Sequence, residues 1–269
     1  MSVASRTARV GMVAACLLGA TGGRSADPPP GVDAWTGPLA MELRLASTTR
    51  MPLLGRQRSV TTSLMLVTVE RSGGGWTQRH RVCDVRVQGS SSTVRVLVPP
   101  AFVHALPARE YPAVLREGGD GVGYTADLGV EAIGYDPALS GGKLPERIDA
   151  PGVRDTDGDG RPGATIRLRV PVAGTADLYI VQRSHLVLGG REVRPGRIEG
   201  AVRILAQEQR TLGAEPGFFA RNPSTAPDPA RSGFTLVRAP GVRDCEGLRK
   251  TAFELFNGGR PPASPTPRG

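Results

Sequence analysis

The sequence predicts an all-β protein, an antiparallel meander of about eight or nine strands with a short helix near its C-terminus. Apolar and polar residues alternate over most of the chain, which places every second side chain on one face of a strand. Glycine and proline, 36 and 24 of the 269 residues, separate these stretches, and both favour turns. Most neighbouring stretches have no helical pattern between them, although a parallel sheet would need helical crossovers.

The first half of the chain predicts four strands. Leucine and methionine alternate with other residues over 39–45. Residues 59–71 and 76–87 are rich in Val, Thr and Leu, and the turn Ser72-Gly73-Gly74-Gly75 between them predicts a hairpin. A fourth strand over 93–98 ends at Pro99-Pro100. The pattern breaks over 101–118, where residues 101–106 suggest a short helix and the prolines at 107 and 112 exclude a long one.

The second half predicts five more strands and the helix. Residues 122–135 alternate through Tyr124, Ala126, Leu128, Val130 and Ala132, and 136–163 form the longest irregular stretch. Strands follow over 165–172, 176–188, 197–207 and 233–238, with a loop rich in Pro, Asn and Ser over 215–230. Asp244 is expected to cap a helix over 246–256, which Asn257-Gly258-Gly259 ends.

Composition divides the chain into four parts. Residues 1–22 predict a signal segment, because Arg6 and Arg9 precede an apolar run that is too short to span a bilayer. Residues 23–37 form a Pro-rich linker, 38–257 a single β domain, and 258–269 a polar tail expected to be disordered.

Two cleavage interpretations of the signal segment stay open. Ala20-Thr21-Gly22 has the small-x-small pattern of an ordinary signal peptidase site, whereas Val13-Ala14-Ala15-Cys16 is similar to a bacterial lipobox, in which Cys16 carries the lipid. Both predict an exported protein, either secreted or held in the cell envelope. In the lipobox interpretation, the lipid on Cys16 would attach the chain to a membrane.

Two cysteines remain after Cys16 is set aside, Cys83 and Cys245. An even number of cysteines in an oxidising compartment predicts a disulfide between them. The alternative is two separate buried thiols.

The formal charge of +9 comes almost entirely from arginine, since lysine occurs only at 143 and 250. The arginines are spread singly through the predicted strands, with no block of like charge. This spacing predicts a solvated surface, with no nucleic-acid partner and no membrane contact other than a lipidated Cys16.

The segment Asp155-Thr156-Asp157-Gly158-Asp159-Gly160 has the spacing of a calcium loop. Carboxylates at its first, third and fifth places converge on one ion, the glycine at the sixth makes the turn, and the backbone carbonyl of Arg161 supplies a further ligand. The segment resembles the Asp-rich loops of EF-hands, dockerins and thrombospondin type-3 repeats, and this resemblance implies a structural Ca²⁺. The twelfth place carries Ile166 where an EF-hand has Glu, so Glu146, Asp149 or Asp136 could complete the shell. The alternative is a solvated Asp-Gly turn.

Catalytic patterns are weak in this sequence. The histidines His80, His104 and His185 lack the spacing of a zinc site. There is also no Gly-x-Ser-x-Gly elbow and no Gly-rich phosphate loop between a strand and a helix.

The meander with one terminal helix resembles the lipocalin-like barrels, although their Gly-x-Trp motif is absent and Trp35 precedes Gly37 here. We therefore expect a non-enzymatic exported barrel, stabilised by calcium and a disulfide, that holds a small apolar ligand. One alternative is a secreted hydrolase acting on polysaccharide or lipid with a structural calcium ion, and another is an envelope structural or adhesion module. The sequence assigns neither a ligand nor an oligomeric state.

The mature N-terminus distinguishes the two cleavage interpretations. We expect a free N-terminus at Gly23, which follows the small-x-small site. Processing at Cys16 would instead add acyl mass and carry the protein into a detergent phase. The intact mass of the exported protein checks this, and a mature chain that starts at an acylated Cys16 contradicts it.

Overall fold

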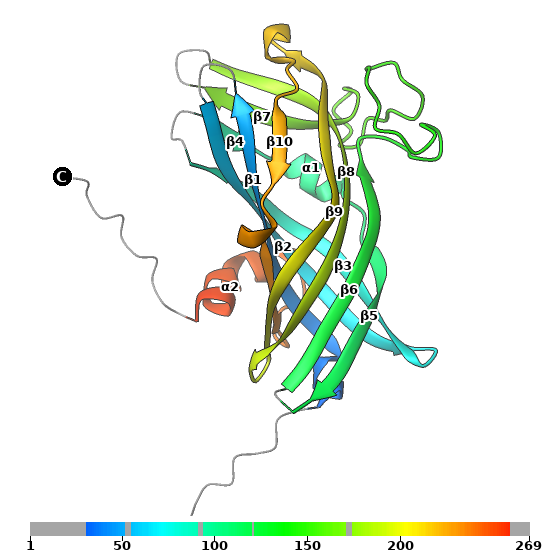
Figure 1. The fold of residues 1–269 in the computed structure, drawn as a ribbon, viewed down its shortest axis with the longest axis vertical. Coiled ribbons are helices and arrows are strands. Elements are labelled where there is room, and N and C mark those ends of the chain that lie inside the picture. Colours follow the sequence, from blue (N-terminus) through cyan, green and yellow to red (C-terminus); the bar gives the residue numbers. More distant parts are fainter. Residues whose placement is uncertain (1–30, 52–54, 91–93, 120, 171–173, 259–269) are drawn as a thin grey trace, which may run out of the picture.

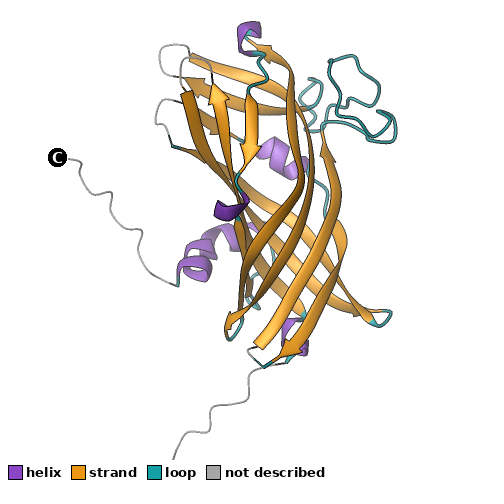
Figure 2. Cartoon of the chain, in the orientation of Figure 1, coloured by secondary structure: helices purple, strands orange, loops and turns teal. Residues whose placement is uncertain are grey.

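The computed structural model describes residues 31–258 except 52–54, 91–93, 120 and 171–173. Strands dominate it, which confirms the all-β fold (Figure 2). The elements, in chain order, are η1 (Val32–Trp35), β1 (Gly37–Met51), β2 (Gly55–Ser72), β3 (Gly75–Gly89), β4 (Arg95–Leu97), α1 (Pro100–Ala105), β5 (Arg109–Gly118), β6 (Gly121–Ile133), β7 (Ala164–Val170), β8 (Gly174–Arg194), β9 (Arg197–Glu215), η2 (Gly217–Phe219), β10 (Ser224–Pro227), η3 (Pro229–Arg231), β11 (Gly233–Arg238) and α2 (Cys245–Asn257).

The strands form one 11-stranded sheet that closes into a ring. Around the ring the order is β8-β6-β5-β3-β2-β1-β11-β9, and β9 pairs back with β8. Every pairing in the ring is antiparallel, and many neighbours in the ring are also neighbours in sequence, so the predicted meander is confirmed. Three strands extend from the ring: β7 pairs with β8, β4 with β7, and β10 with β1 (Figure 1).

The main core fills the inside of the ring with side chains from alternate positions of its strands. Leu39, Met41 and Val67 are at most 1% exposed and belong to one apolar cluster with residues of β5, β6, β8, β9 and β11. Trp35 of η1 is fully buried in the same cluster. The C-terminal end of the predicted linker 23–37 is thus part of the folded domain. The likeness to lipocalins stays a prediction.

The C-terminal helix packs on the outer face of the sheet (Figure 1). Leu248 and Phe256 of α2 lie in a second apolar cluster with residues of β1, β2, β3 and β11. The side chain of Asp244 accepts a hydrogen bond from the Gly247 amide at 2.7 Å, so the predicted N-cap is correct. The disulfide between Cys83 and Cys245 joins β3 to the first residue of α2, as predicted.

One ring strand was missed by the sequence reasoning. Residues 109–118 form β5, although the alternation was expected to break over 101–118, where Pro112 excluded only a long helix. Pro112 is paired only with Thr77 of β3, because pairing with β6 begins at Ala113. The proline therefore lies outside the ladder with β6, at a place where its missing N–H is tolerated. The alternation of buried Tyr111, Ala113 and Leu115 was the signal for this strand.

Two further expectations were wrong in detail. Val130, expected on the inner face of 122–135, is 60% exposed, because a register shift between Asp127 and Val130 changes which positions face inward. Part of the expected loop 215–230 pairs with β1 as β10. The signal segment, Cys16 and residues 259–269 lie outside the described residues. Within the described chain, no helix has the length and apolar character needed to cross a membrane.

Removing the disulfide should strongly destabilise the fold. The bridge spans 162 residues, and closing a loop of that length restrains the unfolded chain by about 5 kcal/mol in the chain-entropy model. The double variant Cys83→Ala/Cys245→Ala should therefore melt roughly 10–20 °C below the wild type. Cys16→Ala is the control, and it should melt like the wild type. Two thiols that alkylate in the folded, unreduced protein would contradict the bridge.

Candidate metal site

The predicted calcium loop lies in the long connection between β6 and β7. The connection folds back on itself, because the Arg154 amide donates to the Gly134 carbonyl at 3.0 Å and the Gly163 amide donates to the Arg154 carbonyl at 2.7 Å. Asp155 and Gly163 form an isolated parallel bridge. Residues 155–163 therefore form a loop whose two ends lie side by side.

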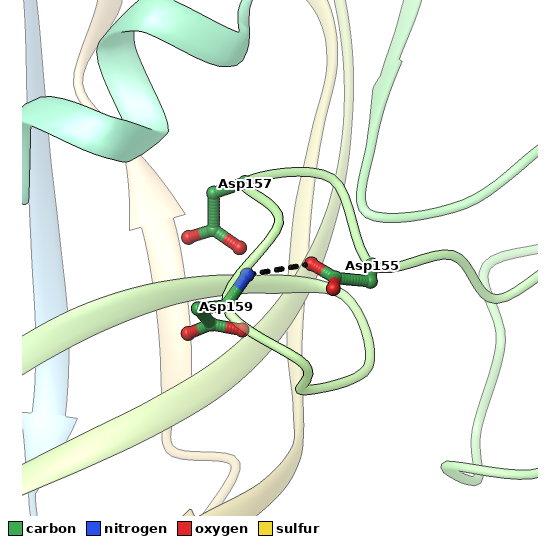
Figure 3. Close-up of side chains that lie close together, drawn as sticks. All are labelled: Asp155, Asp157 and Asp159. Atoms are coloured by element: carbon green, nitrogen blue, oxygen red, sulfur yellow. Dashed lines mark hydrogen bonds between the residues drawn. The ribbon is translucent and has the colours of Figure 1, made fainter.

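The structure brings the three predicted carboxylates together. Asp155, Asp157 and Asp159 each offer a carboxylate oxygen, and these oxygens lie within 4.8 Å of one another (Figure 3). This is the one group of at least three potential metal ligands found among the described residues. The arrangement can hold a metal ion.

Backbone amides shape the turn around Asp155. Its Oδ1 accepts from the Gly158 amide at 2.8 Å and from the Asp159 amide at 3.3 Å, while its Oδ2 accepts from the Gly160 amide at 2.8 Å. Gly158 and Gly160 have positive φ values of 71° and 80°, which L side chains rarely adopt. The two glycines thus allow the chain to wrap its amides around one carboxylate.

The other two carboxylates tie the loop to the start of β7. Asp157 Oδ2 accepts from the Thr165 amide at 2.9 Å, and Asp159 Oδ2 accepts from the Thr165 hydroxyl at 2.6 Å. Thr165 is buried and pairs with Tyr179 of β8. Any ion held by the three aspartates is therefore linked directly to the ordered sheet.

Asp157 is the electrostatically strained member of the group. Its pKa is raised, mainly because burial disfavours the charged form and further because Asp159 and Asp155 are negatively charged. Its Oδ1 is buried and has no hydrogen-bond partner among the described residues. A cation at this point would offset both the lost hydration and the repulsion.

Arg161, predicted to offer its carbonyl oxygen, follows the cluster directly. Its amide donates to Asp159 Oδ1 at 2.8 Å. Its guanidinium donates to Glu215 Oε2 at 2.7 Å and lies over the Tyr179 ring, 5.5 Å from the centroid. The Arg161 side chain thus connects the loop to β8 and β9. That its carbonyl oxygen binds a metal ion stays a prediction.

The acids suggested for completing the metal shell have other partners. Glu146 pairs with Arg210 at 2.6 Å, Asp149 with Arg147 at 2.5 Å, and Asp136 with Arg154. Ile166, at the twelfth place, is packed in an apolar cluster with Phe102 and Val103 of α1. Among the described residues, the candidate metal site therefore has three carboxylates. The alternation of Asp and Gly in the sequence predicted them.

The three histidines lie on three different elements of the fold. His80 is buried inside the ring, where burial lowers its pKa to about 4. His185 lies on the strand β8 and its Nε2 is 2.8 Å from Asp127 Oδ1. His104 lies on α1.

No family model, no curated protein and no solved structure matches this chain. Its function is therefore argued from its own residues.

Replacing Asp157 by Asn should stabilise the metal-free protein at pH 7. The raised pKa means that the charged carboxylate destabilises the fold once the pH rises from the unfolded value, about 3.9, through the folded value. Asn carries no charge and keeps an oxygen for the Thr165 amide. In chelator, the melting midpoint of Asp157→Asn should exceed that of the wild type at pH 7, and the difference should vanish near pH 3.

Asp149→Asn is the matched control for this prediction. Asp149 lies in the same connection, but its pKa is lowered by the hydrogen bond from Arg147, so its charge favours the folded state at pH 7. This variant should show no gain. An equal gain in both variants would mean that Asp157 is not under electrostatic strain.

Proposed function

We propose that Asp155, Asp157 and Asp159 bind Ca²⁺ and that the ion is structural. The convergence of three carboxylate oxygens within 4.8 Å carries this proposal. Carboxylate oxygens are hard ligands, and calcium accepts six to eight oxygens in flexible geometry, so water and the Arg161 carbonyl can fill the remaining places. The absence of a Glu at the twelfth place predicts weak binding, of the order of 10⁻⁴–10⁻³ M as in extracellular modules.

The protein that carries this site is proposed to be a non-catalytic, exported binding or structural protein. The disulfide Cys83–Cys245 supports export, because such bonds persist in oxidising compartments. The apolar residues and Arg6 and Arg9 in the first 22 residues support it as well. The ion would hold the start of β7 through Asp157 and Asp159, and the disulfide anchors α2 on β3.

A small apolar ligand inside the ring is the finer part of this proposal. At the level of Trp35, Tyr124 and Leu188 the interior is filled by side chains that are at most 1% exposed. Any ligand would have to lie farther along the ring. The hydrolase alternative stays a prediction that no particular group of described residues favours.

Calcium should raise the stability of the wild type in a way that depends on Asp157. At 100 times the dissociation constant, an ion that binds only the folded state adds about 2.7 kcal/mol, which corresponds to a rise of roughly 5–10 °C in melting midpoint. Asp157→Asn should lose most of this rise, because it removes a charged ligand. Thermal melts in excess calcium and in chelator measure the difference.

The same melts on Asp149→Asn provide the control, since this variant should keep the full calcium response. Magnesium in place of calcium should give a smaller rise, because Mg²⁺ demands near-ideal octahedral geometry. If the wild-type midpoint is the same with calcium and with chelator, the loop is only a turn and the proposal is wrong.

A further inference from the structure

Two pairs of exposed arginines face each other across neighbouring strands at one end of the ring. Arg50 of β1 is the direct partner of Arg56 of β2, and Arg95 of β4 is the direct partner of Arg169 of β7. Like charges directly opposite one another repel. Within the described part of the chain, none of these four side chains has an ion-pair partner. Among the residues that the structure describes, this positive charge at the end of the ring therefore has no ion-pair partner.

Carboxylates on the neighbouring strand segments are already engaged. Asp177 of β8, near Arg169, pairs with Arg167 at 2.7 Å. Glu215 accepts from Arg161, as described above. The ion pairs of these acids are with other arginines, not with the arginines that face each other.

A groove on the outer face shows the chemistry that this end offers. It is lined by Thr48, Arg56, Arg58 and Ser90, which come from β1, from β2 and from the residue after β3. Thr48 and Arg58 are direct cross-strand partners, and so are Arg50 and Arg56 two residues farther along. The side chains of these two pairs therefore project from the same face of the sheet. Guanidinium and hydroxyl groups together are suited to binding phosphate oxygens.

An aromatic pair, one ring exposed and the other half-buried, lies at the same end. Phe218 of η2 is 63% exposed, and its ring centroid is 4.3 Å from that of Phe219. η2 connects the end of β9 to β10, whose Ser224 pairs with Arg50 (Figure 1). The Phe218–Phe219 pair therefore lies at the tip of the connection that leads to the β1–β10 ladder, beyond the pairing of Arg50 with Ser224.

We propose that this end of the ring docks on a membrane surface that contains anionic phospholipid. The arginines would lie against the lipid phosphates, since a basic residue near an anionic leaflet is attracted to it. Phe218 and Phe219 would enter the interface, where exposed apolar side chains gain burial. A membrane fits better than a nucleic acid, because the two rings pack on each other at a loop tip and do not form a platform on a strand face. This contact needs neither a lipid on Cys16 nor a bound ion.

Vesicle co-sedimentation tests the proposal on the full chain carrying Cys16→Ser, which cannot be acylated at that residue. The vesicles are phosphatidylcholine alone or phosphatidylcholine with phosphatidylglycerol. The protein should bind the anionic vesicles more tightly. Arg50→Gln/Arg56→Gln should weaken that binding about 25-fold, at roughly 5-fold for each arginine. Phe218→Ser/Phe219→Ser should weaken it as well.

The matched control is Arg116→Gln/Arg191→Gln, which removes the same charge. Both residues are exposed and flank Gly123 on β6, at the opposite end of the ring. This control should keep the wild-type affinity, and Arg50→Gln/Arg56→Gln should melt no lower than the wild type because it relieves repulsion.

Three results would overturn the proposal. The first is an equal loss of binding in the control, which would mean that only net charge matters. The second is displacement of the wild type from vesicles by inorganic phosphate at constant ionic strength, which would indicate a site for free phosphate. The third is binding to single-stranded DNA that depends on Arg50 and Arg56 in a protein that does not bind the vesicles.

Discussion

The closure of the sheet by β11 is the constraint on which the rest of the structure depends. β11 pairs with β1 on one side and with β9 on the other, and without it both strands would expose unpaired N–H and C=O groups. Closure draws the β8–β9 ladder against the side chain of Phe234. A Cβ added at Gly200 would lie 2.2 Å from the Gly189 carbonyl oxygen and 2.5 Å from Phe234 Cε1. Glycine at this position is therefore required by the close approach of β8 and β9 and of the Phe234 ring.

Local sequence patterns predicted most of this fold. Alternating apolar residues indicated nine of the strands, and Asp244 indicated the start of α2. The failures came where one strand's geometry depends on its neighbour. The stretch 101–118 was expected to interrupt the strands, yet β5 lies within it, and whether Pro112 fits a strand depends on where pairing with β6 begins. The shift at Asp127 moved Val130 outward, and no period within 122–135 could show it, since a bulge is defined by the partner strand.

The two candidate sites differ in the same way: one follows from local sequence, and the other from the pairing of neighbouring strands. The Asp-rich loop was predictable because its three carboxylates lie within five residues, and the ligand geometry follows from that spacing. The arginines could not be grouped from the sequence, where they are spread singly among acids. Arg50 and Arg56 become neighbours only through the register of β1 and β2, and Arg95 and Arg169 only through that of β4 and β7. The acids that dilute the charge in sequence are paired with other arginines in space.

The strand β7 connects these two features mechanically. Near the start of β7, Thr165 donates hydrogen bonds to Asp157 and Asp159. The other end of the strand carries Arg169. Among the described strands, β4 is hydrogen-bonded to β7 alone, so Arg95 is positioned only as well as β7 is. An ion that draws the three aspartates together would hold Thr165 in place and with it the register of β7 on β8. In a protein that binds both calcium and an anionic surface, the ion would therefore help to position Arg95 and Arg169 without contacting them. The Arg50–Arg56 pair is set by the register of β1 on β2 and would not depend on β7.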